Sequence, residues 1–231
     1  LVELGVMAVV EEKPRVVNAL SVVFSNKKRL VWDVREINSR IDLEKLTLES
    51  LDDAAELLEE NFCGATSDLE AGYFQVGLAE EQQTLLGCAF VNPDTQKTVF
   101  FVSKTMILGE RSAVHSFTRL LKPVVKQARL LGWKGVVYVD DFYHIGKNHE
   151  DCLASRQILK SEAIKAGWLF SEAKEQEPST CTRFLGYDMN SATMKFEVPG
   201  DKLELVLTKI SGLLSRKSFI TNRRLAKVVG H

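Results

Sequence analysis

The stretch Gly135-Val-Val-Tyr-Val-Asp-Asp-Phe-Tyr-His-Ile-Gly146 decides the fold of this 231-residue chain. It holds two short runs of apolar, β-prone residues on either side of the acidic pair Asp140-Asp141. Such runs around a short polar break predict a β-hairpin with the two acids at its tip. Carboxylates at the end of an apolar hairpin are costly to bury, so they must reach water or a cation. Taken alone, the pair fits an ordinary turn at least as well, because Asp is common in turns.

A third acid gives the pair a chemical context. Asp68 lies near the end of the strand-like run at 62–69. If adjacent strands bring Asp68 beside Asp140, the carboxylates form a compact, oxygen-rich site of the kind that suits Mg²⁺. Two such ions stabilise both the attacking and the leaving oxygen of a phosphoryl transfer. The three acids therefore indicate metal-assisted phosphoryl chemistry.

The rest of the chain mixes helical and strand-like patterns. Apolar residues recur at helical spacing at 48–61, 112–131, 148–166, 201–214 and 217–229, with Pro123 as a predicted kink or break in the second of these. Strand-like runs lie at 14–24, 29–38, 84–90 and 98–102, and a further hairpin is predicted from 182–190 and 194–198. This order predicts an α+β fold, with a split βαβ sheet that carries helices on one face.

Composition excludes several classes of protein. With 45% hydrophobic and 26% charged residues the chain is neither disordered as a whole nor able to supply a membrane-spanning helix. The net charge of −1 argues weakly against a nucleic-acid partner, but it conceals a polarity. Residues 41–70 carry ten acids against one lysine, whereas residues 201–231 carry seven cations against two acids. With a basic face on the 112–131 helix, this predicts salt-sensitive binding of a duplex along one side of the molecule.

Cysteine and histidine give no sign of a second chemistry. The four cysteines lie far apart in the sequence, without the spacing of a zinc site or a disulfide framework, and fit reduced thiols of an intracellular protein. Three of the four histidines have no partner at metal-binding or catalytic-triad spacing. We interpret these three as ordinary surface or partly buried residues, namely His115, His144 and His149.

Several short boxes occur in the order and spacing of one known family. Tyr138-Val-Asp-Asp141 resembles the signature box of reverse transcriptases, and Asp68 followed by Gly72-Tyr-Phe-Gln-Val76 resembles their first catalytic-aspartate box. The other matches are Lys27-Lys-Arg-Leu30 with Asp33, Arg35 and Asn38 (fingers), Gly167 with Lys174 (glycine–lysine box), and Phe184-Leu-Gly-Tyr187 (primer-grip hairpin). Each box is weak alone, but the ordered set identifies the chain as a reverse transcriptase domain. Three further segments, at 18–23, 117–123 and 225–230, are similar to those of DIRS-type, tyrosine-recombinase retrotransposons, with long-terminal-repeat or pararetroviral elements as the alternative.

The resemblance implies a catalytic role for four residues. Asp68, Asp140 and Asp141 would hold two Mg²⁺ ions, for which Mn²⁺ is a substitute, and Asp141 would be the looser ligand. Lys174 would donate a proton to the leaving pyrophosphate, although a solvated loop lysine is an equally good interpretation. The expected reaction is attack of a primer 3′-hydroxyl on a deoxynucleoside triphosphate, directed by an RNA or DNA template.

The resemblance also implies residues that bind the nucleotide. Arg29, with Lys27 or Lys28, would contact the triphosphate, because a guanidinium matches phosphate oxygens. Tyr73 would be the steric gate against a 2′-hydroxyl, and Val139 would lie beside the same sugar.

One box departs from the family pattern. In the stretch Ile107–Val114, Gly109 fits the base- and template-contacting box, but Leu108 replaces the usual Gln or Phe, and Val114 stands where proline is expected. This departure favours an alternative, a weakened or inactive reverse-transcriptase-like domain that binds nucleic acid or serves as a scaffold. An RNA-directed RNA polymerase is disfavoured by Tyr73.

The implied architecture is that of a right-hand polymerase. Residues 1–61 would be mainly fingers, 62–200 mainly palm with a fingers insertion at about 78–108, and 201–231 the truncated start of the thumb or connection. The expected partners are a template–primer duplex and a deoxynucleoside triphosphate, with no membrane. The chain would come from a longer intracellular protein with RNase H and recombinase or integrase domains.

Overall fold

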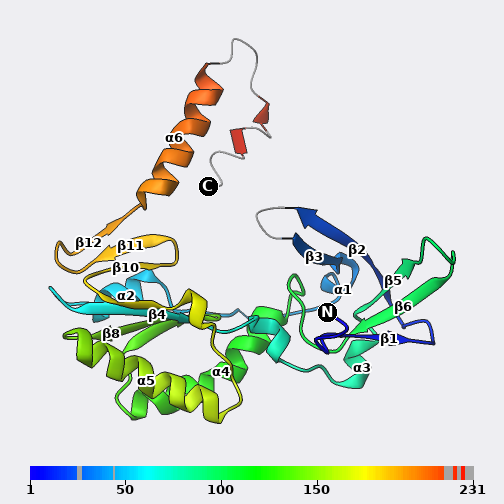
Figure 1. The fold of residues 1–231 in the computed structure, drawn as a ribbon, viewed down its shortest axis with the longest axis horizontal. Coiled ribbons are helices and arrows are strands. Elements are labelled where there is room, and N and C mark those ends of the chain that lie inside the picture. Colours follow the sequence, from blue (N-terminus) through cyan, green and yellow to red (C-terminus); the bar gives the residue numbers. More distant parts are fainter. Residues whose placement is uncertain (25–27, 44, 216–220, 223–224, 227–231) are drawn as a thin grey trace.

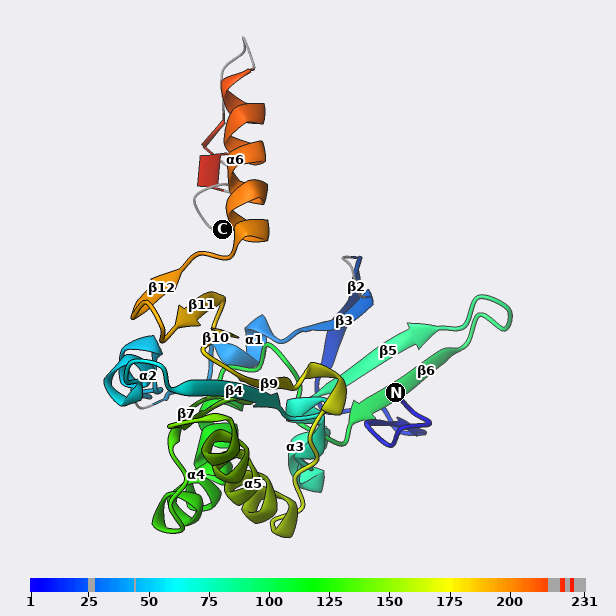
Figure 2. The ribbon, with the colours of Figure 1, turned by 60° about the vertical axis from the view of Figure 1, so that its left-hand side comes forward.

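The computed structural model describes the chain except for residues 25–27, 44, 216–220, 223–224 and 227–231 (Figure 1). Its strands and helices form two lobes joined side by side, and the helix α6 (Gly200–Leu214) projects from the second of them. The chain begins in the first lobe. The view of Figure 2, which is turned about the vertical axis, also shows the two lobes as separate units. The mixed α+β fold predicted from the sequence is thus confirmed.

The first lobe is built on a five-stranded sheet in the order β1-β6-β5-β2-β3. Its strands are β1 (Met7–Val10), β2 (Val17–Phe24), β3 (Lys28–Asp33), β5 (Gly87–Val91) and β6 (Thr98–Ser103). Short helices α1 (Arg35–Asn38) and α3 (Glu80–Gln83) accompany the sheet. All neighbours pair antiparallel except β2 and β5, which are parallel. Side chains such as Trp32, Val34 and Ile107 form the core of this lobe.

The second lobe is built on a four-stranded antiparallel sheet in the order β7-β8-β4-β9. Its strands are β4 (Cys63–Asp68), β7 (Gly135–Tyr138), β8 (Asp141–Gly146) and β9 (Gln176–Ser179). The accompanying elements are α2 (Leu51–Leu57), α4 (Ala113–Leu130), α5 (His149–Lys165), and a three-stranded sheet of β10 (Cys181–Phe184), β11 (Tyr187–Asn190) and β12 (Lys195–Glu197). Two 3₁₀ turns, η1 (Gly72–Gln75) and η2 (Glu172–Lys174), complete it.

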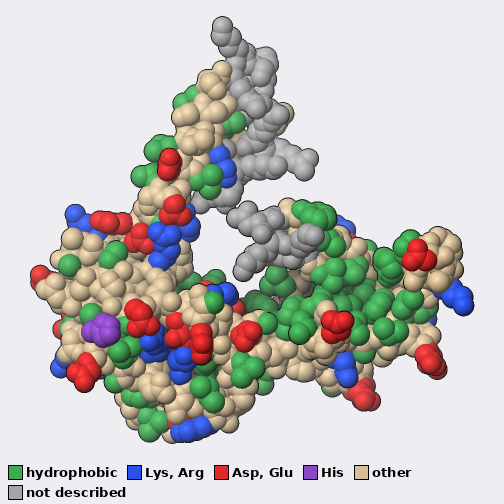
Figure 3. All heavy atoms as spheres, in the orientation of Figure 1, with side chains coloured by type: hydrophobic (Ala, Val, Ile, Leu, Met, Phe, Trp, Pro, Cys, Tyr) green, Lys and Arg blue, Asp and Glu red, His purple; other side chains and the backbone are tan. Residues whose placement is uncertain are grey.

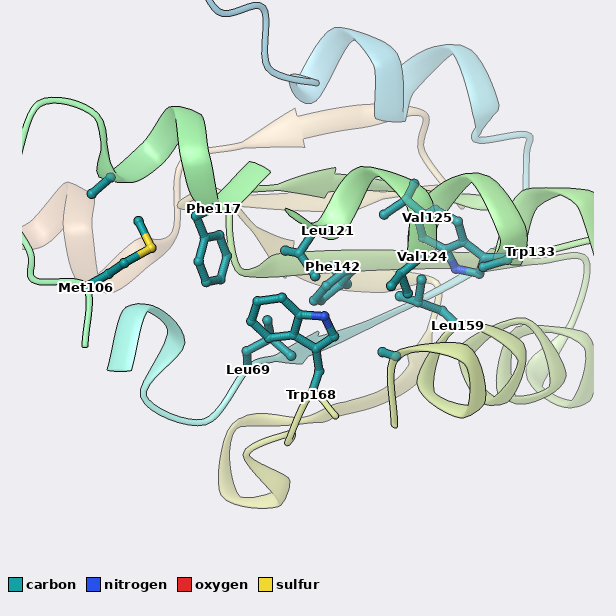
Figure 4. Packing of buried hydrophobic residues seen from close by; sticks show 13 residues of the cluster. Leu69, Met106, Phe117, Leu121, Val124, Val125, Trp133, Phe142, Leu159 and Trp168 are labelled. Atoms are coloured by element: carbon teal, nitrogen blue, oxygen red, sulfur yellow. The ribbon is translucent and has the colours of Figure 1, made fainter. Parts of the chain in front are cut away.

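Both faces of the four-stranded sheet are covered, because successive side chains of a strand point to opposite faces. On one face, Phe142 packs with α4 and α5 residues such as Phe117 and Leu159 (Figure 4). On the other, Tyr143 and Ile145 pack with α2 and with the β10–β11 hairpin. Burial on both faces explains why the decisive stretch reads as apolar runs without polar alternation. The sheet is therefore the middle layer of the lobe.

Most predicted elements are present, with informative differences. Pro123 lies inside α4, which continues through it, so the predicted split does not occur. Strands β1 and β9 were not expected from the sequence, because each has four residues and lies at a sheet edge, where pairing depends on a neighbour far along the chain. Pro178 is compatible with β9 because an edge strand leaves some N–H positions unpaired. The helix predicted at 217–229 falls largely outside the described residues.

The sequence predicts that the basic residues of α4 and of the C-terminal segment share one face that binds a duplex. Five of the seven cations at 201–231 lie outside the described residues, so the structure describes mainly the α4 part of this prediction. Helix α4 packs on one face of the four-stranded sheet, and α6 rises beyond the opposite face (Figures 1 and 2). The α4 cations line a hollow of about 580 Å³ beside residues 46–49. The amphipathic pattern located the basic face correctly on the helix, but only packing decides where that face points.

The surface over the first lobe differs from that over the second. Hydrophobic side chains gather over the five-stranded sheet, whereas acidic and basic side chains are interspersed over the second lobe (Figure 3). None of the helices in the described part of the chain is both long enough and apolar enough to cross a membrane.

Candidate active site

The two acidic segments meet because β4 and β8 pair antiparallel. The register places Asp68 directly opposite Asp141, at the end of both strands. The β7–β8 hairpin pairs Tyr138 with Asp141, which leaves Val139 and Asp140 as its two-residue turn. Adjacent strands place facing residues within about 5 Å of each other, so all three acids lie close together where β4 ends and β8 begins. The predicted juxtaposition of Asp68 with the acidic pair is present.

The turn itself is strained. Val139 has a φ of 57°, in the left-handed region that β-branched residues rarely adopt. A positive φ at the first central residue alone is the pattern of a type II′ turn, where glycine is the usual residue. Strain of this kind costs about 1–3 kcal/mol and persists where the surrounding structure enforces it. Here the strained turn places Asp140 at the tip of the hairpin.

Asp140 and Asp141 border an open cavity of about 800 Å³ that is lined by residues of both lobes. Val22 of β2 and Leu30 of β3 form its wall on the first lobe. The second lobe contributes the Tyr138–Asp141 tip, Lys174 and the segment around η1. Among the predicted site residues, the cavity is lined by Tyr73, Val139, Asp140, Asp141 and Lys174. Asp68 instead lines an adjoining hollow of about 440 Å³, which shares Asp141 and Lys174 with the first.

The carboxylates perturb each other. Burial, with a smaller contribution from the charge of Asp68, raises the pKa of Asp140. Burial, together with the charges of the neighbouring acids Asp140 and Asp68, raises the pKa of Asp141 to about 6. A raised carboxyl pKa in a cleft is a common mark of a functional site. The arrangement concentrates negative charge and favours binding of a cation.

Lys174 lies in direct contact with this cluster. Its ammonium donates to Asp68 Oδ1 over 2.7 Å, although 106 residues separate the two in sequence. The hydrogen bond with Asp68 is the main reason that the pKa of Lys174 is raised, so the side chain stays charged. The structure therefore places Lys174 in contact with one of the three acids, and its role as a proton donor stays a prediction.

Tyr73 is held on the floor of the cavity by aromatic contacts. Its ring lies edge-on to Phe117 of α4, with 5.0 Å between centroids, and Phe117 makes a similar contact with Trp168 at 5.3 Å. Phe117 and Trp168 are buried, so the half-buried Tyr73 ring has a rigid support. Burial also raises the pKa of Tyr73, and its hydroxyl stays protonated. The ring is thus a fixed, bulky wall of the cavity.

The structure gives contacts to two residues of the box at 72–76 for which the sequence predicted no role of their own. Gly72 has a φ of +30°, and a Cβ atom there would lie 2.9 Å from Asp140 Oδ2. Gln75 donates to the carbonyl oxygens of Glu70 and Leu169 and accepts from Leu169 N, so it fastens η1 to the segment after α5. Both belong to the box around Tyr73. In the sequence, the position of Gly72 and Gln75 close to Tyr73 was the only indication that they belong to the site.

The predicted nucleotide-binding residues of the first lobe are only partly visible. Lys27 lies outside the described residues, and for Lys28 and Arg29 only the backbone of β3 is described. Leu30 lines the cavity, so β3 passes along it. Gly109 is absent from the cavity wall. Its carbonyl accepts from Asn38 Nδ2 over 2.8 Å, which ties this turn to α1.

Leu108, in the altered box, does reach the cavity. Its side chain is 63% exposed and lines the same hollow as the acids. The departure from the family pattern therefore lies at the site itself.

One histidine differs from the sequence-based interpretation. His144 is fully buried, whereas we expected a surface or partly buried residue. Its Nδ1 accepts from Trp133 Nε1 over 3.0 Å, so its Nε2 carries the proton and donates to Ser67 Oγ over 2.7 Å. Burial lowers the pKa of His144 to about 3, which keeps the ring neutral. Its partners lie 11 and 77 residues away in the sequence, so local spacing could not reveal this chain of contacts.

The donor set suits a hard divalent cation. It consists of carboxylate oxygens, which Mg²⁺ and Mn²⁺ prefer, and their mutual repulsion would be relieved by a bound ion. Within the described ranges, no three Asp, Glu, His or Cys side chains already stand in an arrangement that would hold a metal ion. Asp68 is engaged by Lys174 instead. The residue types therefore fit a metal site, and binding requires the side chains to rearrange.

A family model described as reverse transcriptase (RNA-dependent DNA polymerase) matches residues 11–189. The chain belongs to the reverse transcriptase family. The match spans both lobes and includes all three acids, Tyr73 and Lys174. A search of curated proteins finds no match to the chain.

Solved structures of reverse transcriptases share the fold. The chain is similar to a foamy viral protease-reverse transcriptase in complex with double-stranded DNA, with a TM-score of 0.79 and 18% identity over 99% of this chain. A foamy viral protease-reverse transcriptase in complex with an RNA/DNA hybrid gives a TM-score of 0.78, also at 18% identity over 99% of this chain. This chain spans 37% of the length of the first of these solved chains and 28% of the length of the second. At this identity the similarity establishes the fold alone.

The fit of Gly72 against Asp140 predicts a sharp effect of one methyl group. In Gly72→Ala, the new Cβ must displace the Asp140 carboxylate or the η1 backbone, and we expect DNA synthesis to fall about tenfold or more. Gly77→Ala is the matched control, because a Cβ at Gly77 meets nothing within 4 Å. Primer extension by the two variants measures the difference, and equal activity would contradict the tight fit.

The raised pKa of Asp141 predicts a pH-dependent stability in chelator-treated protein. The folded state holds this proton up to about pH 6, against 3.8 ordinarily, so the associated stability is complete below about pH 4 and is lost as the pH rises through 6. Asp141→Asn should abolish this loss and raise the free energy of unfolding at pH 7.5 by about 1–2 kcal/mol, allowing for solvent screening.

Urea unfolding between pH 4 and 8 measures this effect. The control is Asp94→Asn, which changes an exposed acid in the β5–β6 turn. If the Asp141 variant kept the pH slope of the unchanged protein, the assignment of the raised pKa would be wrong.

Proposed function

We propose that this chain is the fingers and palm of an RNA-directed DNA polymerase, which extends a primer with deoxynucleotides by two-metal-ion nucleotidyl transfer. The observation that carries the proposal is the β4–β8 register, which sets Asp68 opposite Asp141 and beside Asp140. The cavity between the two lobes gives these acids a bordering space for a substrate. Family membership supports the reaction class.

In this proposal Asp68 and Asp140 are the main metal ligands, and Asp141 is the looser one. Bound Mg²⁺ ions would neutralise phosphate charge and lower the pKa of the primer 3′-hydroxyl. The protein contributes positioning and electrostatic complementarity, which account for most of the catalysis of phosphoryl transfer. The 3′-hydroxyl oxygen forms a bond with the α-phosphorus, and the bond to pyrophosphate breaks. Lys174 is proposed to give its proton to the leaving pyrophosphate.

The remaining site residues are proposed to select and hold the nucleotide. Tyr73 would block a 2′-hydroxyl, and its rigid aromatic support favours this steric role. Val139 would contact the same sugar from the strained turn. Arg29, Lys27 and Lys28 would bind the triphosphate from β3 and the segment before it.

Residues 1–61 are proposed to be mainly fingers, with a fingers insertion at about 78–108, residues 62–200 mainly palm, and the residues from 201 the start of a thumb. Within the first of these ranges, helix α2 belongs to the second lobe. The proposed partners are a template–primer duplex and a deoxynucleoside triphosphate. The foamy viral proteins, whose structures contain double-stranded DNA or an RNA/DNA hybrid, support this class of partner. RNase H and recombinase or integrase domains are proposed for the full-length protein.

We propose a DIRS-type retrotransposon as the source lineage. The motifs at 18–23, 117–123 and 225–230 support this lineage, although the structural similarity is to a foamy viral enzyme.

A second candidate is a catalytically weakened domain that binds nucleic acid. The specific observation in its favour is Leu108, which is exposed in the cavity where the family usually has Gln or Phe. A large exposed aliphatic group at a binding site changes how bases are contacted. This candidate predicts template–primer binding with little or no extension.

Replacing Asp140 tests the proposed reaction. We expect Asp140→Asn to reduce primer extension on RNA and DNA templates by about a hundredfold or more, because a metal ligand loses its charge. Asp94→Asn should extend primers as the unchanged protein does. Extension unaffected by Asp140→Asn would remove Asp140 from the site, and duplex binding without extension by the unchanged chain would favour the second candidate.

Replacing Tyr73 tests the proposed sugar selection. We expect Tyr73→Val to raise the incorporation of ribonucleotides relative to deoxynucleotides by about tenfold or more, because the ring no longer occupies the space under the sugar. Tyr73→Phe keeps the ring and should keep the discrimination. Single-nucleotide incorporation assays give both ratios, and an unchanged ratio in the Val variant would exclude the gate.

A further inference from the structure

Lys174 lies between the two open spaces beside the acids. It lines both the cavity of about 800 Å³, which holds Tyr73 and Asp140, and the adjoining hollow of about 440 Å³, which holds Asp68. Asp141 is the only other residue among the described ones that lines both spaces. The Lys174 ammonium therefore lies at the junction of the two spaces, in contact with one of the carboxylates that would have to share an ion.

The backbone around Lys174 is firmly attached. Ser171 N donates to the carbonyl oxygen of Asp68 over 2.9 Å, and Lys174 N donates to Ser171 O over 3.2 Å. The next residue, Glu175, forms ion pairs with Lys160 and with Arg156 of α5, and all three side chains are largely buried. Paired charges in such a setting hold their elements in one arrangement. The base of Lys174 is thus fixed with respect to Asp68.

The Lys174 side chain, by contrast, is free to change its conformation. It is 54% exposed, whereas Asp68 is 17% exposed. Lysine has a flexible stem of four carbons, so its ammonium can leave one partner for another without movement of the backbone. The fixed base and the exposed, flexible stem together allow the charge to move between the two spaces.

We propose that Lys174 is the resting counter-cation of Asp68, holding this carboxylate in the absence of metal and leaving it when a divalent ion binds. This proposal rests on the proposed function and adds a step that precedes the reaction. In the resting state Lys174 neutralises the acid that lies opposite Asp141. Metal binding therefore competes with an internal ion pair.

The exchange has a consequence for the reaction. Once released from Asp68, the ammonium remains at the edge of the cavity that would hold the triphosphate. Binding of the metal ion and movement of the Lys174 ammonium toward the leaving group would then be coupled. This coupling would suppress metal binding at Asp68 until Lys174 has a new partner.

Mn²⁺ binding without nucleotide tests the competition. We expect Lys174→Gln to bind Mn²⁺ at least about fivefold more tightly than the unchanged protein, as measured by electron paramagnetic resonance of free Mn²⁺. Lys202→Gln is the matched control. It removes one cation from the same hollow, and Lys202 donates to Gly186 O over 3.1 Å without an ion pair to the three acids. Its Mn²⁺ affinity should change less than about twofold.

The movement of Lys174 has its own readout. After reductive ¹³C-methylation of lysines, the Lys174 resonance is the one missing from Lys174→Gln. We expect it to shift on addition of Mg²⁺ with the midpoint of metal binding, and to start at the shifted position in Asp68→Asn.

The outcomes separate this proposal from the proposed function. If the unchanged protein extends primers but Lys174→Gln binds Mn²⁺ no more tightly, or no more tightly than Lys202→Gln does, the counter-cation proposal is wrong and the function stands. A Lys174 resonance that is insensitive to saturating Mg²⁺ also overturns it. If the unchanged protein neither binds Mn²⁺ nor extends primers, both proposals are wrong.

Discussion

The antiparallel pairing of β4 with β8 is the constraint on which the rest of the site depends. It joins segments more than 70 residues apart and sets Asp68 opposite Asp141. Because the side-chain period of a strand is two residues, a slip of one residue would send every side chain of β8 to the wrong face. The register is held by two different cores, with Phe142 in one and Tyr143 in the other. Packing on both faces thus fixes the geometry of the acids.

The features of this geometry that cost folding free energy lie together at the ends of β4 and β8. Three carboxylates lie together there, a β-branched residue takes a left-handed conformation, and a glycine is required beside Asp140. Each of these features opposes folding locally. They are compensated by the buried layers around them and, at Asp68, by the ammonium of Lys174. Conflict between local preference and global fold is typical of functional sites, where stability is lost in exchange for chemistry.

Contacts behind the acids show how the site is kept rigid. Two buried hydrogen bonds connect Trp133, His144 and Ser67. They link the segment before β7 to β8, and β8 to β4 at the residue next to Asp68. On the other side, the ion pairs of Glu175 attach the Lys174 segment to α5. The first set of partners is buried and the second is largely buried, and a lost hydrogen bond costs more in such a setting than at the surface. The acids are therefore held from two directions by polar contacts that lie outside the cavity of about 800 Å³.

The sequence by itself determined the α+β class, the hairpin at 135–146, the long helices and the identity of the acids, because these follow from local periodicity and from short motifs. It did not reveal the edge strand β9, the buried state of His144, the need for glycine at 72, or the direction in which the basic face of α4 points. Each of these depends on a partner distant in the chain, and side-chain type and spacing carry no information about that partner. The contact between Lys174 and Asp68 is of the same kind. The sequence names two charged residues 106 positions apart, and only the packing of β4, β8 and η2 makes them one ion pair.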